Sequence, residues 1–216
     1  MTVTMILADV LSNPLGGLFF LLSIVMAVSV HEFAHAKTAD VLGDPTPASM
    51  GRLTLNPKAH LDLMGSILFL LVGFGWGKPV PFDPYNLENP KRDAALIALA
   101  GPSSNFAMAL IASGLLYSYS LVAVSTISLV GQLFLSTFIW INIVLGVFNL
   151  LPFAPLDGFK IVGGLMSHEN AAKWYSMERY GILFLLFFIL PFAGGKSMLQ
   201  LFVIPLVQGV TGVLIP

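Results

Sequence analysis

Two histidines and a glutamate stand close together in the sequence HEFAH, near the end of the first apolar segment. His31 and His35 are four residues apart, so on a helix they share one face and can bind one metal ion. Glu32 can then lie over the open position of that ion. Zinc bound by two imidazoles and a carboxylate keeps a water, lowers its pKa and needs a nearby base. The motif predicts zinc-assisted hydrolysis; an inert, hydrogen-bonded cluster at a helix end is the alternative.

A third protein ligand must come from a distant part of the chain, because two histidines are too few for zinc. His60 and His168 are candidates, but each lies in a polar stretch where an exposed histidine without a role is expected. Asp157 is the stronger candidate, because it follows prolines that end an apolar segment. Broken backbone at membrane depth is tolerated only where it is buried or lines a wet cavity. A helix cap is the alternative role for Asp157, and the unfilled zinc position favours the ligand.

The composition is typical of a membrane protein. Of 216 residues, 56% are hydrophobic and only 10% are charged, whereas a soluble domain is usually about a quarter charged. The net charge of −1 offers no basic surface for nucleic acid, and the absence of cysteine excludes disulfides and thiolate zinc sites. The apolar segments long enough to span a bilayer are 15–37, 94–119, 127–150, 175–192 and 197–215.

Two further segments follow the first apolar one. Segment 63–77 is apolar but shorter, and residues 52–55 alternate in the manner of a short strand. We therefore expect an all-α polytopic membrane protein with about five to six transmembrane helices and a short β-hairpin or re-entrant element after the first. Residues 1–216 are expected to form a single membrane-embedded domain, with a catalytic core over about 15–160 and C-terminal helices over about 171–216.

The zinc site constrains the topology, because its ligands must lie at one depth. From Leu15 to His31 a helix rises about 24 Å, which places the histidines near the far side of a core about 30 Å thick. Asp157 returns to that side only after an even number of crossings, which segments 94–119 and 127–150 supply. Segment 63–77 is therefore expected to be re-entrant or interfacial.

The basic residues agree with this topology. Every lysine and arginine except Lys196 then lies on one side of the membrane, which the positive-inside rule assigns to the cytoplasm. We expect a multi-pass protein of the cell membrane with an external N-terminus and a site that opens toward the cytoplasm.

Three motifs resemble the signatures of the site-2 protease family of intramembrane zinc metalloproteases. They are HEFAH at 31–35, GPSSN at 101–105 and NLLPFAPLDG at 149–158. The stretch GWGKPVPFDPYNLENPKRDAALIALAGP also resembles the compact bacterial and archaeal members, so the resemblance covers roughly residues 15–160. No sequence for a PDZ or CBS module, which many relatives carry, is found.

The resemblance implies a role for six residues. It implies His31, His35 and Asp157 as ligands of one zinc ion per chain, and Glu32 as the general base. It also implies a polar group near the scissile carbonyl, Asn149, which can hold the developing oxyanion. For the remaining residue, Asn105, it leaves two roles open, which are to orient the substrate or to join two helices.

The expected activity is hydrolysis of peptide bonds in membrane-spanning protein substrates, with the lipid bilayer as surroundings. A helical substrate must unwind before attack, and segment 48–55 could pair with it as an added strand. A surface hairpin with no substrate role is the alternative for that segment. For the whole chain, the alternative is a transporter or channel with an ion-coordinating His/Glu/Asp site, although its usual inverted repeat is not evident.

Overall fold

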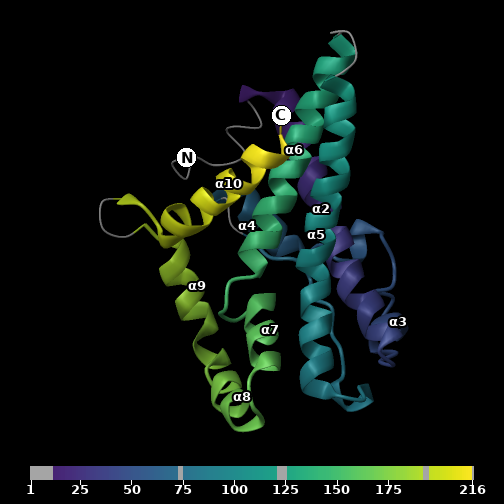
Figure 1. The fold of residues 1–216 in the computed structure, drawn as a ribbon, viewed down its shortest axis with the longest axis vertical. Helices are drawn as coiled ribbons and strands as arrows, with labels where there is room; N and C mark the ends of the chain where they lie inside the picture. Colours follow the sequence, from purple (N-terminus) through teal and green to yellow (C-terminus); the bar gives the residue numbers. More distant parts are fainter. Residues whose placement is uncertain (1–11, 73–74, 121–125, 192–194, 216) are drawn as a thin grey trace.

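A computed structural model describes residues 12–72, 75–120, 126–191 and 195–215, and all regular elements within these ranges are helical (Figure 1). The α-helices are α2 (Pro14–Val41), α3 (Thr46–Ser49), α4 (Leu63–Val72), α5 (Pro90–Ser120), α6 (Thr126–Asn149), α7 (Asp157–Leu165), α8 (His168–Tyr175), α9 (Gly181–Ile189) and α10 (Ile204–Leu214). Short 3-10 helices lie at Pro57–Ala59, Pro84–Asn86 and Glu178–Tyr180, and the π-helical stretch Leu199–Val203 precedes α10. The expectation of an all-α chain is confirmed.

The helix that carries the HEFAH motif, α2, begins and ends at residues suited to those positions. The side chain of Asn13 caps its start by accepting a hydrogen bond from Gly16 N at 3.1 Å, and Pro14 occupies the first helical position. Gly43 follows the end with a φ of 101°, which glycine adopts without strain. The 28 residues extend about 42 Å, so both histidines lie in the second half of the helix.

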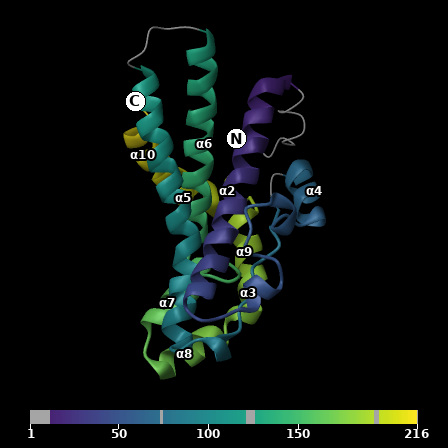
Figure 2. The same ribbon diagram turned by 90° about the vertical axis from the view of Figure 1, so that its right-hand side faces the viewer.

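The helices α2, α5 and α6 lie side by side in two perpendicular views (Figures 1 and 2). The main apolar core lies between α5 and α6 and is closed by the C-terminal helical segment. Its buried members are Ala109, Ala112, Leu116, Phe138, Ile139, Ile143, Val203 and Val207. An edge-to-face pair, Phe19 and Phe134, joins α2 to α6 with ring centroids 5.4 Å apart.

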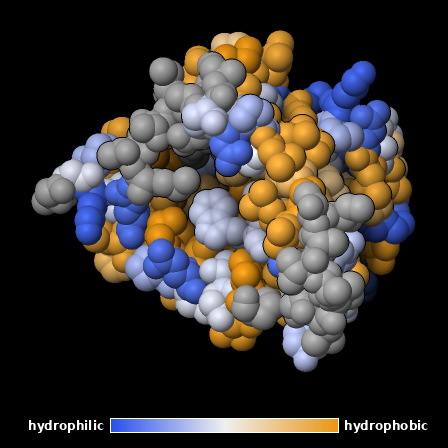
Figure 3. All heavy atoms as spheres, turned by 90° about the horizontal axis from the view of Figure 1, so that it is seen from above, coloured by the Kyte–Doolittle hydropathy of each residue, from blue (hydrophilic) through white to orange (hydrophobic). Residues whose placement is uncertain are grey.

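Large apolar side chains also cover the outside of these helices. Examples are Leu18, Leu22 and Met26 on α2, and Leu110, Ile111 and Leu115 on α5. Viewed along the long axis, hydrophobic residues occupy much of the surface and alternate with hydrophilic patches (Figure 3). Contiguous exposed apolar surface of this kind is typical of contact with lipid.

Among the described residues, α2, α5 and α6 are long and apolar enough to cross a membrane. The expectation of five to six transmembrane helices is not confirmed. The nine residues of α9 extend about 14 Å and Leu199–Leu214 about 24 Å, against a hydrocarbon core about 30 Å thick. The apolar run 175–192 is shortened because α8 and a 3-10 turn occupy its first residues.

The strand expected at 52–55 is wrong, and no β-hairpin forms there. Residues 46–49 form α3, and Gly51 then turns the chain with a φ of 68°. Two backbone donors at the ends of this stretch bond locally, because Arg52 N donates to Pro47 O at 2.8 Å and Asn56 N donates to the Thr54 hydroxyl at 3.1 Å. Neither of these donors is available for a ladder with a second strand.

The segment around α4 leaves the bundle and returns to it. Leu61 and Gly77 form an isolated antiparallel bridge, and Lys78 N donates to His60 O at 2.7 Å. The two ends of the segment 63–77 therefore lie side by side. Phe69 of α4 stacks on Phe20 of α2, with ring centroids 5.9 Å apart, and this contact joins α4, which lies to one side of the long helices in Figure 2, to α2.

Candidate metal centre

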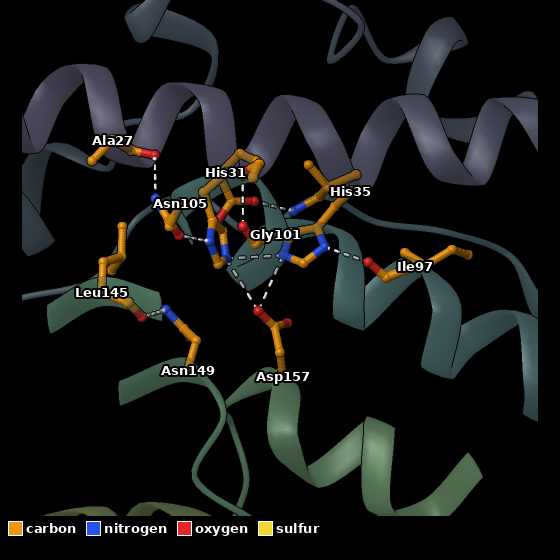
Figure 4. Close-up of polar contacts among 12 residues, drawn as sticks. Ala27, His31, His35, Ile97, Gly101, Asn105, Leu145, Asn149 and Asp157 are labelled. Atoms are coloured by element: carbon orange, nitrogen blue, oxygen red, sulfur yellow. Dashed lines mark hydrogen bonds and ion pairs between the residues drawn. The ribbon is translucent and has the colours of Figure 1, made fainter. Parts of the chain in front are cut away.

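Two helices bring three metal-ligating side chains together (Figure 4). His31 and His35 project from the same face of α2, and Asp157 points at both rings from the first turn of α7. The Nε2 atoms of the two histidines lie 3.0 Å apart. Asp157 Oδ2 lies 3.1 Å from the Nε2 of His31 and 3.2 Å from that of His35. The three atoms form a nearly equilateral triangle in the interior.

The hydrogen bonds of the two rings fix which nitrogen faces the triangle. His35 Nδ1 lies 2.7 Å from Ile97 O, and a carbonyl can only accept, so Nδ1 carries the proton. His31 Nδ1 lies 2.7 Å from Asn105 Oδ1, which accepts from it in the same way. Each Nε2 therefore directs a lone pair at the other and at Asp157.

These residues fit a zinc ion. Three acceptor atoms face one another, and Asp157 Oδ2 is buried with no hydrogen-bond donor. Such a cluster is repulsive unless a cation lies among its members. Tetrahedral zinc with ligands at about 2.0–2.1 Å separates them by about 3.3 Å, close to the observed 3.0–3.2 Å. Three protein ligands leave the fourth position open, as in catalytic zinc sites.

The chain between α6 and α7 delivers Asp157 to this place. Leu156 occupies the N-cap position of α7, and Asp157 is the first residue of the helix. Asp157 is therefore not the capping residue. Gly158 allows the turn, because a Cβ there would lie 2.3 Å from Leu150 O and 2.4 Å from Leu151 O. The end of α6 and the start of α7 therefore pack without space for a side chain.

The helix α5 supports the histidines from the other side. At Gly101 its backbone approaches both rings so closely that a Cβ would lie 2.5 Å from His35 Nε2 and 2.6 Å from His31 Cε1. Only glycine fits this contact.

Glu32 lies outside the triangle and contacts the segment that follows α4. Its Oε2 accepts a hydrogen bond from Val80 N at 3.1 Å. The buried Arg52 holds the same segment, because its Nη2 donates to Lys78 O. Burial lowers the pKa of the Arg52 guanidinium, and the negative charge of Glu32 opposes that shift. The carboxylate is thus oriented by a backbone N–H and not by a metal ligand.

The other sequence candidates lie elsewhere. His168 is exposed at the start of α8, as expected. His60 is fully buried, contrary to the expectation of an exposed histidine, and its Nε2 lies 2.7 Å from Thr54 O. Asn149 donates to Leu145 O of its own helix at 3.0 Å.

Sequence reasoning missed Asn142. This residue is fully buried in α6, and its Oδ1 accepts from Asn105 Nδ2 at 3.0 Å. The available signal was an amide in the middle of an apolar segment, where polar side chains commonly bond to a neighbouring helix.

Comparison with known proteins identifies one family and several relatives. The sequence profile of peptidase family M50 matches residues 122–192. The chain is 38% identical over 198 residues to "Putative zinc metalloprotease YwhC" of Bacillus subtilis, a match covering 85% of this chain and 90% of that protein.

Two mycobacterial relatives are also similar. "Putative zinc metalloprotease Rip2" of Mycobacterium tuberculosis is 30% identical over 79% of this chain and 66% of its own length. The protein of the same name in Mycolicibacterium smegmatis is 31% identical over 68% of this chain and 55% of its own length. The matches therefore span about half to two thirds of these longer relatives. No solved structure matches the chain.

Proposed function

The chain belongs to peptidase family M50, the site-2 protease family, and we propose that His31, His35 and Asp157 hold its zinc ion. The protein is an intramembrane zinc metalloprotease, and zinc is its cofactor. The observation that carries the ligand assignment is the triangle of three acceptor atoms 3.0–3.2 Å apart, one of which, Asp157 Oδ2, is buried without a hydrogen-bond donor. Zinc bound there supplies a Lewis acid that polarises the carbonyl and acidifies water.

Glu32 is the proposed general base. Its carboxylate takes a proton from the attacking water and later gives it to the leaving amine of the peptide bond. The N–H of Val80 holds Oε2, which leaves Oε1 as the atom that exchanges the proton. Arg52 holds the segment that carries Val80, so the base is positioned by backbone from outside the long helices.

Asn149 is the proposed donor to the carbonyl oxygen of the substrate. It ends α6, eight residues before Asp157 in the sequence, and its side chain is half-buried. To donate to an oxyanion, its amide must exchange the bond to Leu145 O for one to the substrate.

The substrate is proposed to be a membrane-spanning protein, since the ligands lie between apolar helices. The family supports a peptide or protein substrate. The first ligand, His31, lies about 25 Å along α2 from Pro14. The peptide groups of a helical substrate are paired within the helix, so the helix must unwind locally to bring a peptide bond to the site.

We also propose that the chain forms one membrane domain in the cell membrane. In this topology α2, α5 and α6 cross the bilayer, segment 63–77 enters and returns, and the zinc site faces the cytoplasm. The bridge between Leu61 and Gly77 supports the return, and an even number of crossings brings Asp157 back to the histidines. The apolar segments 175–192 and 197–215 are the proposed fourth and fifth crossings. Since α9 extends only about 14 Å and Leu199–Leu214 about 24 Å, residues outside these helices must complete each crossing.

Single cysteines test this topology, because the chain contains none. An impermeant thiol reagent applied outside should label a cysteine at Ser118 or Lys196 and should miss one at Asn86 or Ser176. External labelling at Asn86 would mean that segment 63–77 crosses. Labelling of Lys196 and Ser176 from the same side would remove the fourth crossing.

The function is tested by separating zinc binding from turnover. Glu32→Gln should retain zinc and the fold while cleaving a membrane-spanning peptide about 10²–10⁴-fold more slowly. His31→Ala should lose zinc and cleavage together. Near-parental cleavage by zinc-loaded Glu32→Gln would contradict the assignment of the base. Ion flux through vesicles that survives in Glu32→Gln, without cleavage by the parent, would instead favour the transporter.

A further inference from the structure

We infer that Asn105 and Asn142 form a hydrogen-bonded relay that holds His31 in the tautomer a metal ligand requires. The inference rests on the proposed function, because it takes His31 as a ligand. It assigns both asparagines as positioning residues that act through the histidine ring and do not touch the substrate.

The relay joins three helices through the interior. His31 Nδ1 of α2 lies 2.7 Å from Asn105 Oδ1 of α5, and Asn105 Nδ2 lies 3.0 Å from Asn142 Oδ1 of α6. Asn142 Nδ2 donates to Phe138 O at 2.9 Å, within its own helix. Neither amide side chain is exposed. Buried amides in these positions must satisfy one another, since no solvent reaches them.

The direction of every bond follows from the last acceptor. A backbone carbonyl has no hydrogen to donate, so Asn142 must turn its NH₂ group toward Phe138 O. The oxygen of Asn142 then faces Asn105, so Asn105 must donate to it from its own NH₂ group. This leaves Asn105 Oδ1 toward the ring, so His31 Nδ1 must carry the proton. The lone pair of His31 is thereby directed through Nε2 at the metal position.

His35 shows why a relay is needed at His31. His35 Nδ1 donates its proton to a backbone carbonyl, Ile97 O, which can only accept a hydrogen bond. The partner of His31 is a side-chain amide, and a rotation of about 180° would exchange its oxygen for its NH₂ group. The rotated Asn105 would donate to Nδ1, move the proton to Nε2 and block the metal position.

Two acceptors oppose that rotation. Besides Asn142 Oδ1, the carbonyl of Ala27 on α2 accepts from Asn105 Nδ2 at 3.4 Å. Rotation would place Asn105 Oδ1 against both oxygens and leave these buried groups unpaired, which is unfavourable. Removal of Asn142 alone should therefore weaken the preference, even though Asn142 does not touch His31.

The competing explanation is that the two amides only join the helices, which buried asparagines in membrane proteins commonly do. The explanations differ in what they predict for the ring. Helix joining requires two amides that bond to each other and predicts loss of stability alone. The relay requires an acceptor next to Nδ1 and predicts a change in tautomer and in zinc affinity.

The test measures zinc affinity by competition with a chelator, and the His31 tautomer by ¹⁵N NMR of the metal-free protein. The His31 signals are those missing in His31→Ala. Asn105→Leu should bind zinc about 10–100-fold more weakly, and the neutral His31 ring should become a mixture of the Nδ1–H and Nε2–H tautomers. Asn142→Leu should change both readouts in the same direction and to a lesser extent. The double variant should lose no more zinc affinity than Asn105→Leu alone, because the two residues act through the same series of hydrogen bonds.

Asn105→Asp is the rescue variant. Its carboxylate keeps an acceptor at Nδ1, as carboxylates often do behind metal-bound histidines, so near-parental zinc affinity is expected. Its second oxygen meets Asn142 Oδ1 and Ala27 O without a donor, so the cost of this substitution is expected in thermal stability. Thr211→Val is the control for loss of a buried polar group, since Thr211 is buried in α10 and bonds only within its helix. It should leave affinity and tautomer unchanged.

The relay is overturned if His31 keeps the Nδ1 proton and zinc affinity is parental in both leucine variants, or if Asn105→Asp binds zinc as weakly as Asn105→Leu. If Asn105→Leu does not fold, Asn142→Leu against Thr211→Val decides the question. The His31 tautomer is measured in the metal-free protein, so this readout does not depend on zinc binding. If the parent protein binds no zinc, the ligand assignment is contradicted, and the tautomer of the leucine variants still tests the relay.

Discussion

Because α5 contacts both histidine rings at Gly101, the substitution Gly101→Ala should displace the rings directly. An added Cβ would lie 2.5 Å from His35 Nε2 and Cε1 and 2.6 Å from His31 Cε1, whereas ordinary contact begins at 3.4 Å. The rings or the helix must therefore move by about 0.9 Å. Zinc sites tolerate about 0.2 Å in ligand distance, so this movement takes at least one Nε2 out of bonding range.

The expected loss is large for so small a group. A displacement of about 1 Å in a catalytic group can cost about 10²-fold in rate, and weaker zinc binding adds to it. Alanine is preferred over glycine in a helix by up to about 1 kcal/mol, so the intrinsic effect of the substitution on α5 is stabilising. Loss of function is therefore expected from the clash with the rings.

Gly114→Ala is the matched control, because Gly114 lies in the same helix and a Cβ there meets nothing within 4 Å. Zinc affinity by chelator competition, cleavage of a membrane-spanning peptide and thermal unfolding should be measured for both variants. Gly101→Ala should lose zinc and cleavage, and Gly114→Ala should retain both. Parental zinc affinity in Gly101→Ala would refute the close approach of α5 to the rings.

Two further predictions follow from the loop contacts and the ligand set. Asp157→Ala should retain zinc poorly, because two imidazoles form a weak site, and full retention on dialysis would remove Asp157 from the site. Asp44 is buried and accepts hydrogen bonds from Thr46 N, Asp83 N and Asn86 Nδ2 at 3.0, 2.7 and 2.8 Å. Burial alone would raise the pKa of this carboxyl, but the hydrogen bonds more than offset it and the pKa lies below its usual value. Its contribution to stability should therefore be full above about pH 4 and fall as the pH drops further, and Asp44→Asn should abolish that part of the pH dependence of thermal unfolding. If the thermal stability of Asp44→Asn falls at acid pH as much as that of the parent protein does, this assignment is contradicted.

The three residues that the structure brings together in the candidate metal centre could be singled out from the sequence, because each lies in a short pattern of its own. His31 and His35 repeat at helical spacing, and Asp157 lies beside a glycine after a proline-broken helix. Asn142 could not be paired with Asn105 from the sequence, because the bond joins residues 37 positions apart through the packing of α5 against α6. Nothing in the local pattern specifies which face of α6 meets α5.

The differences from the expected fold also have physical reasons. Alternation at 52–55 resembles a strand, but a strand needs a partner strand with which to bond. Among the described residues no strand lies beside 52–55, and Arg52 N instead donates to Pro47 O across the turn at Gly51. The hydrophobicity of residues 175–192 reflects composition and does not show whether the segment forms one continuous helix. Its first residues complete α8 and a 3-10 turn, so the helix that remains, Gly181–Ile189, is short.

X-ray absorption at the zinc edge of the loaded protein tests the central claim most directly. The account predicts a four-coordinate ion with nitrogen and oxygen ligands at about 2.0–2.1 Å and the outer-shell scattering of two imidazoles, which His31 and His35 supply. The chain has four histidines in all. A spectrum with one imidazole, or with a third that only His60 or His168 could provide, would contradict the proposed ligand set.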